Sequence, residues 1–239
     1  MGVFMKIIVQ TALLLAAAWT IIPTAAARTC STHVKKRGYD RKQIALTFDD
    51  GPDPVYTPLL LETLQKYNVQ ATFFIVGEKA ERHPDLIRRI QKEGHDIGIH
   101  NDRHISNWLL SPSAMNHQLV RAAERVSAIT GERVTLYRPP WGHFNPVTLS
   151  KAKRFETIMW TSIPGDWKKN MTTRRLADKL RNARSNGAII TLHDSGNTLG
   201  AYKMAPRMMI ESLHLFLSDE DSRQYEFVTV TNLFNKQRA

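Results

Sequence analysis

The sequence of 239 residues contains a single cysteine, Cys30, and this scarcity limits how the fold can be held together. One thiol cannot form an internal disulfide, and it cannot build a cysteine-based metal site. Stability must therefore come from packing, for which a hydrophobic content of 42% is ample in a chain of this length. Internal repeats and low-complexity segments are absent too, and the apolar content excludes a disordered chain.

Acidic residues are also few, since 22 Asp and Glu face 33 Lys and Arg and leave a formal net charge of +11. A surface of this sign favours anionic partners, which outside a cell are acidic wall polymers or anionic lipids. We do not expect nucleic acid as the partner. The basic residues are scattered in pairs such as Arg88-Arg89 and Lys168-Lys169, without a long tract or a recognisable reading motif.

The one long apolar stretch lies at the N-terminus, where residues 7–27 follow the single charge of Lys6. Three alanines before Arg28 supply the small residues that a signal peptidase needs. We expect residues 1–27 to be a signal peptide cleaved after Ala27; the alternative is an uncleaved membrane anchor, because the stretch could just span a bilayer. The protein is then exported across the cytoplasmic membrane and is secreted or associated with the cell wall, and it contacts the membrane only if uncleaved.

The remaining chain has two expected parts. Residues 28–42 are polar and basic and are predicted to be a solvated linker. Residues 43–239 have the length of one α/β domain, and we expect a monomer.

From residue 44 onward, short apolar segments alternate with segments of helical periodicity. The run at 188–192 is apolar on both faces, as in a parallel sheet that helices cover on both sides. Ser111, Pro112 and Gly131 provide the cap, first turn and end of the clearest helix. Either a barrel or a doubly wound sheet would satisfy the pattern. The predicted strands are 44–48, 71–76, 96–100, 134–137, 157–160, 187–192 and 227–230, and the predicted helices are 56–67, 78–93, 111–130, 146–153, 172–183 and 204–217.

Polar clusters follow the ends of most of these strands, and active sites of α/β folds lie at that edge of the sheet. Adjacent carboxylates such as Asp49 and Asp50 repel unless a cation or an arginine lies beside them. We therefore assign one acid to a metal ion and the other to proton transfer. The clusters are Asp49-Asp50, 100–104, 138–142, Asp166-Trp167 and His193-Asp194.

His100 and His104 are spaced so that both imidazoles could face one metal ion, with Asp50 as a third ligand. Two imidazoles and one carboxylate leave positions open for water and substrate, as in a catalytic site. This donor set suits Zn²⁺, with Co²⁺, Fe²⁺, Ni²⁺ or Mn²⁺ as alternative divalent ions.

Five segments together carry a resemblance to a known family: Thr47-Phe48-Asp49-Asp50-Gly51-Pro52, His100-x-x-x-His104, Arg138-Pro139-Pro140-Trp141-Gly142, Asp166-Trp167 and Leu192-His193-Asp194. In order and spacing they resemble the motifs of the polysaccharide deacetylases, also called carbohydrate esterase family four. The likeness extends from about residue 43 to residue 234. It implies a single catalytic domain, a distorted (β/α) barrel of about seven parallel strands, that removes acetyl groups from sugars with a divalent metal.

The resemblance also implies a role for each residue. Asp49 would be the general base and His193 the general acid, while Asp50, His100 and His104 would hold the metal. Arg138 would keep Asp49 ionised, and Asp166 would stabilise protonated His193. The backbone N–H of Trp141 would bind the oxyanion of the intermediate. The substrate-binding residues implied are Trp141, Trp167, Leu192 and Pro140.

The sequence departs from the family pattern at three positions. Asn101 replaces a usual Ser or Thr, which should change a hydrogen bond behind the metal ligands more than the metal itself. Ile163 lies where many members carry an additional Asp, and Trp141 replaces a commoner Tyr. We expect metal binding to survive all three changes.

The expected function is removal of N-acetyl groups from an amino-sugar polymer. The basic surface and the export signal favour peptidoglycan, and a chitin-like oligosaccharide is the next choice. Trp108, Leu109 and Leu110 could stack on sugars or simply be buried. The alternatives are deacetylation of O-acetylated xylan, hydrolysis of a small non-sugar amide, and a catalytically weak carbohydrate-binding or morphogenetic protein.

Overall fold

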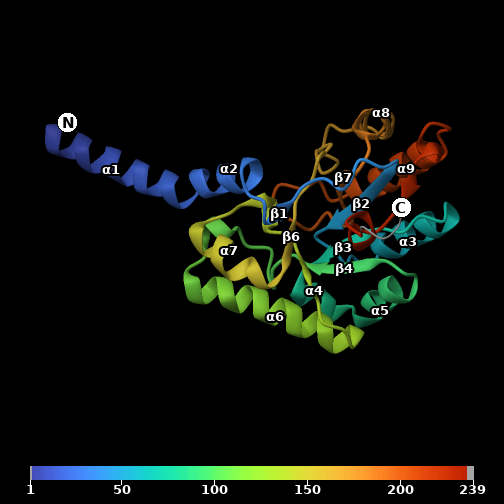
Figure 1. Cartoon of the computed structure of the whole chain (residues 1–239), viewed down its shortest axis with the longest axis horizontal. Coiled ribbons are helices and arrows are strands. Elements are labelled where there is room, and N and C mark those ends of the chain that lie inside the picture. The colour runs from blue at the N-terminus through green and yellow to red at the C-terminus, as the bar shows by residue number, and fades with distance from the viewer. Residues whose placement is uncertain (1, 236–239) are drawn as a thin grey trace.

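A curled sheet of parallel strands forms the centre of the computed structural model, which describes residues 2–235 (Figure 1). Its strand order is β1-β6-β5-β4-β3-β2-β7, and β8 also pairs with β2. A parallel bridge between Ser162 and Ile190 joins the segment after β6 to β7 and draws the two sides of the sheet together. The predicted distorted (β/α) barrel is confirmed. Its strands are β1 (Val34–Lys35), β2 (Gln43–Asp49), β3 (Thr72–Ile75), β4 (Asp96–Ile99), β5 (Leu136–Tyr137), β6 (Glu156–Ile158), β7 (Ala188–His193) and β8 (Glu226–Phe227).

Helices connect successive strands and pack their apolar sides on the sheet. Leu60, Leu61 and Leu64 of the helix after β2 are fully buried, as their spacing predicts. All seven residues of β2 are buried, because neighbouring strands flank it and helices cover it. The helices of the barrel are α3 (Tyr56–Lys66), α4 (Gly77–Arg82), α5 (Pro84–Lys92), α6 (Pro112–Thr130), α7 (Pro146–Lys151), α8 (Thr173–Ala183), α9 (Ala205–Leu217) and α10 (Val230–Leu233).

The structure corrects three predicted elements. The helix predicted at 78–93 is two helices, because the backbone turns at His83 and Pro84 begins α5. The last predicted strand, 227–230, ends early as β8, and Thr229 then caps α10 with its side chain. The segment 28–42, predicted to be a linker, contributes β1 to the sheet because Val34 is buried and pairs with β6.

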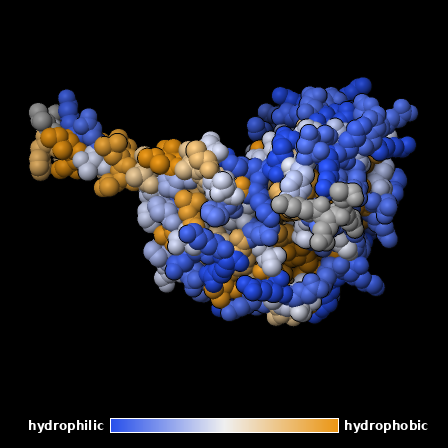
Figure 2. Space-filling view, in the orientation of Figure 1, coloured by the Kyte–Doolittle hydropathy of each residue, from blue (hydrophilic) through white to orange (hydrophobic). Residues whose placement is uncertain are grey.

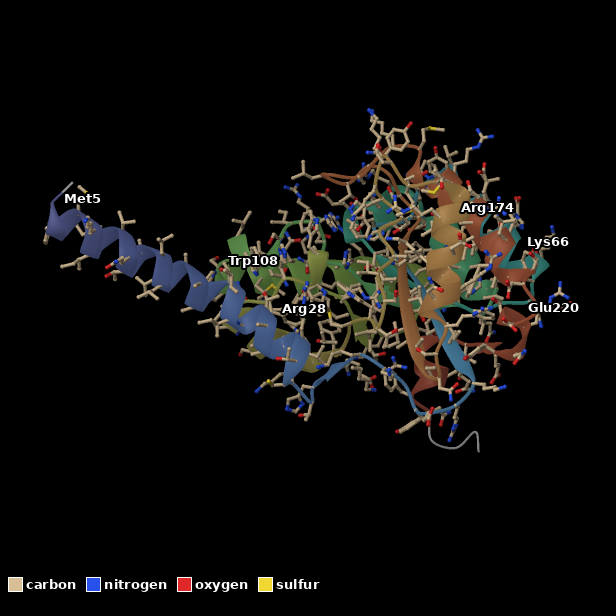
Figure 3. The ribbon with its side chains drawn as sticks, turned by 90° about the horizontal axis from the view of Figure 1, so that it is seen from above. Met5, Arg28, Lys66, Trp108, Arg174 and Glu220 are labelled. Carbon is tan, nitrogen blue, oxygen red and sulfur yellow. The ribbon has the colours of Figure 1, made fainter. Side chains whose placement is uncertain are left out.

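The N-terminal segment forms two helices, α1 (Val3–Trp19) and α2 (Ile21–Thr29). Helix α1 projects away from the barrel (Figure 1). Its surface is mostly hydrophobic, whereas the surface of the barrel is mostly hydrophilic (Figure 2). Phe4–Thr29 has the length of a membrane span and a mean hydropathy of 1.8. A signal sequence has the same properties, so the division at Ala27 stays a prediction. Figure 3 shows Arg28 and Trp108 where this segment meets the barrel.

Candidate active site

One pocket of about 300 Å³ at the carboxyl ends of the strands brings together most of the predicted site residues. Asp49 ends β2, His100 follows β4, and His193 ends β7. Because β2 pairs in parallel with β7, Asp49 and His193 lie side by side at the sheet edge. The pocket is lined by Asp49, Asp50, His100, His104, Trp141, Trp160, Ile163, Trp167, His193, Thr198, Leu199, Gly200 and Ala201.

Asp50, His100 and His104 form a compact cluster whose possible ligand atoms all lie within 4.8 Å of one another. Nε2 of His104 is 3.0 Å and Nε2 of His100 is 3.5 Å from Oδ1 of Asp50. Asp50 adopts a left-handed backbone with φ 76°, which turns its carboxylate from the strand toward the two histidines. Gly51 follows because a Cβ there would collide with the carboxylate of Asp194.

This cluster fits a divalent metal ion. Oδ1 of Asp50 is buried and, apart from the two imidazole nitrogens that face it, has no possible hydrogen-bond partner among the described residues, which is costly unless a cation binds between these three groups. Nδ1 of His100 lies 2.7 Å from the carbonyl oxygen of Arg138. A carbonyl only accepts, so Nδ1 carries the proton and Nε2 is free to act as a ligand. Burial would raise the pKa of Asp50, but the two histidines lower it well below its ordinary value.

Arg138 holds Asp49 from behind the pocket. Its Nη1 donates to Oδ1 of Asp49 at 2.7 Å and to the hydroxyl of Thr47 at 2.7 Å. Its other nitrogens donate to the carbonyls of Ile158 and Met159 in and after β6. Arg138 is fully buried, so the ion pair is shielded from water and its geometry is fixed.

Asp166 holds His193 in the same manner. Oδ2 of Asp166 accepts the backbone N–H of His193 at 2.8 Å, and Oδ1 lies 3.0 Å from Nδ1. Burial disfavours the charged imidazole, but the carboxylate of Asp166 outweighs it, with smaller contributions from Asp50 and Asp49, and the pKa of His193 rises to about 10. His193 is therefore protonated at neutral pH, with Nε2 as its nitrogen on the pocket side.

The turn Pro140–Gly142 presents Trp141 at the mouth of the pocket. Trp141 has φ 54° and Gly142 has φ 62°, two successive left-handed residues. Two hydrogen bonds close the turn, from Gly142 N–H to Pro139 and from His143 N–H to Pro140. The N–H of Trp141 makes no hydrogen bond with any residue of 2–235, so it remains available as a donor. The indole packs edge-on against His104, with ring centroids 4.1 Å apart.

Two predicted pocket residues lie elsewhere. Leu192 is fully buried in the hydrophobic core and does not line the pocket. Successive side chains of a strand point to opposite faces, so placing His193 at the pocket turns Leu192 away from it. Pro140 is buried in the turn and shapes it without lining the pocket. Trp167 lines the pocket and packs edge-on against His193.

The three candidates for sugar stacking have three different surroundings. Trp108 stacks on His143 with ring centroids 3.7 Å apart, and its indole N–H is bonded to Thr24. Leu109 is 81% exposed, and Leu110 packs in the core. Only Leu109 is therefore free to meet a ligand.

The departures from the family pattern have visible consequences. Asn101 has φ 63°, a conformation that Asn tolerates better than Ser or Thr. Its side chain is buried and bonded to Asn107 and Tyr137, which fixes the loop between His100 and His104. Ile163 lines the pocket and makes this wall apolar.

Sequence reasoning missed several residues of the site. Trp160 and the loop 198–201 line the pocket, and Leu199 in this loop is 88% exposed. The available signal was a leucine in a segment of Ser, Gly, Asn and Thr that directly follows the His193-Asp194 cluster. Lys79 also went unrecognised; it donates to the backbone carbonyl of Asp50 at 2.6 Å and to Ser195.

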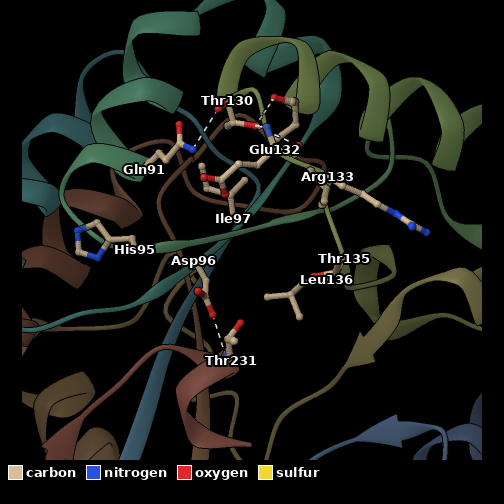
Figure 4. A pocket seen from close by; sticks show the side chains of 12 residues that line it. Gln91, His95, Asp96, Ile97, Thr130, Glu132, Arg133, Thr135, Leu136 and Thr231 are labelled. Atoms are coloured by element: carbon tan, nitrogen blue, oxygen red, sulfur yellow. Dashed lines mark hydrogen bonds between the residues drawn. The ribbon is translucent and has the colours of Figure 1, made fainter. Parts of the chain in front are cut away.

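A second pocket, of about 190 Å³, lies at the opposite end of the sheet, where β4 begins (Figure 4). Its polar side chains join structural elements: Gln91 donates to the carbonyl of Thr130, and Asp96 accepts the N–H of Thr231. Catalytic groups of the kind described above are gathered at the other end, so we assign this pocket a structural role.

Comparison with known proteins agrees with the site. The family model described as polysaccharide deacetylase matches residues 36–160. A peptidoglycan-N-acetylglucosamine deacetylase of Bacillus cereus is 33% identical over 198 residues, covering 81% of this chain and 89% of the relative.

Two solved structures have the same fold. The peptidoglycan deacetylase PdaC from Bacillus subtilis superimposes with a TM-score of 0.71 at 31% identity, over 81% of this chain and 90% of that one. A family 4 acetyl xylan esterase from Clostridium thermocellum, in complex with a cobalt ion, gives a TM-score of 0.71 at 31% identity, over 80% and 89% of the chains. By sequence, fold and motif residues, this chain belongs to the polysaccharide deacetylase family.

Proposed function

We propose that the protein is a metal-dependent deacetylase that hydrolyses the N-acetyl groups of peptidoglycan. One observation carries the proposal. A carboxylate paired with a buried arginine, an imidazole paired with a buried carboxylate, and an Asp-His-His cluster all face one pocket of about 300 Å³.

Asp50, His100 and His104 would hold the metal. Their donor set of two imidazoles and one carboxylate favours Zn²⁺, with Co²⁺, Fe²⁺, Ni²⁺ and Mn²⁺ to be tested beside it. When bound, such an ion polarises the acetyl carbonyl and lowers the pKa of the attacking water.

Asp49 serves as the general base. It is adjacent to Asp50 in the chain and lines the same pocket, so a water held beside the metal ligands would lie within its reach. The ion pair with Arg138 fixes the position of the carboxylate. The two aspartates thus divide the tasks of accepting a proton and binding the metal.

His193 serves as the general acid. A departing sugar amine needs a proton, and His193 carries one at neutral pH because Asp166 stabilises the imidazolium. The free N–H of Trp141 would donate to the developing oxyanion, where a donor held in place contributes most. Trp167, Ile163 and Trp160 form apolar walls around the acetyl methyl.

Peptidoglycan is proposed as the substrate because the B. cereus and B. subtilis relatives are named for it and because the chain carries a net charge of +11. Anionic wall polymers accompany peptidoglycan and attract a basic protein. The apolar N-terminal helix fits export, so we propose that the catalytic domain acts outside the cytoplasmic membrane. We also propose that the protein acts as a monomer. The likeness to a xylan esterase makes O-acetylated xylan the substrate to compare.

The test is acetate release by the full chain, purified in detergent, stripped of metal and then resupplied with Zn²⁺ or Co²⁺. Peptidoglycan, chitooligosaccharides and acetylated xylan are assayed in parallel. Metal-restored release from peptidoglycan above the other two is the expected result. Acetate release only from xylan would show that xylan, and not peptidoglycan, is the substrate. No acetate release from any of the three polymers, with metal bound, would favour the carbohydrate-binding alternative.

A further inference from the structure

The helix α2 is docked into the barrel by one of its faces. Pro23, Thr24 and Ala27 are buried, whereas Ile21 and Ile22 are exposed. Ala27 is three residues after Thr24 and four after Pro23, so all three lie on one side of the helix. Ala27 is only 1% exposed and packs with Phe144 and other residues of its own small cluster.

Thr24 is the centre of this contact. Its hydroxyl donates to the carbonyl of Phe144 at 2.9 Å and accepts the N–H of the same residue at 3.0 Å. It also accepts the indole N–H of Trp108, while the indole N–H of Trp19 donates to the Trp108 carbonyl. A buried hydroxyl with three partners of this kind specifies one docked position.

The docked helix delivers Arg28 to the turn that carries Trp141. Nη2 of Arg28 donates to the carbonyl of Trp141 at 2.9 Å and to that of Gly142 at 3.1 Å. The guanidinium carbon lies 5.7 Å from the ring centre of Trp160, a wall of the catalytic pocket. Figure 3 places Arg28 at this junction of helix and barrel.

The turn needs such support. A left-handed conformation is unfavourable for a residue with a side chain, and Trp141 adopts it with φ 54°. A Cβ on Gly142 would lie 2.7 Å from Nη2 of Arg28, so the glycine also leaves the room that the guanidinium occupies. Arg28 therefore supports both residues of the turn through their carbonyls.

We propose that Arg28 is a positioning residue for the Trp141 N–H, and that residues 19–28 stay attached to the working enzyme, where they hold Arg28 against the turn that carries Trp141. The inference rests on the proposed function, in which that N–H binds the oxyanion. It also selects the uncleaved anchor over cleavage after Ala27, because cleavage removes Trp19, Thr24 and Ala27 and makes Arg28 a free chain end.

The test uses the full chain in detergent and compares Arg28→Gln, Arg28→Lys and Thr24→Val. The control is Arg174→Gln, on α8 and far from the junction (Figure 3). Arg28→Gln and Thr24→Val should lower kcat roughly tenfold, because an oxyanion donor is misplaced but not removed. KM and metal content should stay at wild-type values in both variants, and Arg28→Lys should recover part of kcat. Tm should stay near the wild-type value in Arg28→Gln but fall in Thr24→Val, because that substitution leaves buried groups of Phe144 and Trp108 without their hydrogen-bond partner.

A second readout is independent of turnover. Amide hydrogen exchange at Gly142 and His143, measured on metal-free protein, should accelerate about fivefold in Arg28→Gln and Thr24→Val but not in Arg174→Gln. Unchanged exchange and kcat in Arg28→Gln would overturn the inference. If the wild type releases no acetate, the proposed function fails while exchange still decides the role of Arg28.

The attachment is tested by the intact mass of the protein exported by a bacterial host. A chain that retains residues 19–28 supports the inference. A mature protein that begins at Arg28 and turns over at the rate of the full chain would refute it.

Discussion

Replacing Asp166 with asparagine tests whether His193 is the general acid. Asparagine keeps the shape of the side chain and removes the charge that outweighs burial and raises the pKa of His193 to about 10. The backbone N–H of His193 can still donate to the amide oxygen, so the imidazole keeps its position in the pocket. The main change is in its protonation.

Without that charge, the pKa of His193 falls from about 10 toward its ordinary value of 6.5. For a complete return, the protonated fraction at pH 8 drops from about 99% to about 3%, and at pH 6 it stays near three quarters. We therefore expect kcat of Asp166→Asn to fall roughly 25-fold further at pH 8 than at pH 6.

The stability of the folded protein should also depend on the protonation of His193 and decrease as pH rises. A histidine whose pKa is raised in the folded state contributes stability that is fully present below pH 6.5 and is lost as pH rises through about 10. The wild type should thus exceed Asp166→Asn in Tm most clearly near pH 6, and the difference should shrink above pH 9.

The assay is kcat against pH for acetate release at saturating substrate, together with an NMR titration of the His193 imidazole in metal-free protein. Asp85→Asn serves as the control, since the Asp85 side chain is 94% exposed on α5. An alkaline limb of kcat that stays at the wild-type position in Asp166→Asn would refute the assignment of His193 and its partner.

Three further predictions concern the other residues of the site. Asp50→Ala should lose metal and activity together, whereas Asp49→Asn should keep the metal and lower kcat by about 10²–10⁴-fold; metal content and acetate release decide this, and metal loss in the second variant would contradict the division of tasks. Leu192→Ala should lower the free energy of unfolding in denaturant by about 2–5 kcal/mol with KM unchanged, because the side chain is fully buried; an altered KM with wild-type stability would return Leu192 to the pocket. Leu199→Ala should raise KM about threefold at constant Tm, because this exposed side chain lines the pocket; a wild-type KM would remove it from the substrate site.

The placement of the site was predictable because parallel strands all deliver their carboxyl ends to one edge. Asp49, His100 and His193 follow apolar runs that the sequence marks clearly as strands. The pairing of Arg138 with Asp49 also agrees with its expected role. Local pattern and chemistry both identify these residues, and tertiary structure adds only their distances.

Other features depend on contacts that the local sequence does not encode. The two-residue strand β1 exists because Val34 meets β6, and the same residues in isolation look like a basic linker. Thr24 and Ala27 look like parts of a signal peptide until the barrel provides Phe144 as their partner. The sequence did contain a signal for the break between α4 and α5, because proline prefers the first turn of a helix and Pro84 begins α5. The apolar spacing across Pro84 nevertheless favoured a single helix.

Arg138 links the carboxyl end of β2 to carbonyls in and after β6, and β7 completes the site from far along the chain. A nascent polypeptide therefore has no working catalytic centre until the segment that contains His193 has been synthesised and inserted beside β2. Enzymatic activity consequently reports that β7 lies in place beside β2, so the onset of acetate release during refolding would time the insertion of that strand.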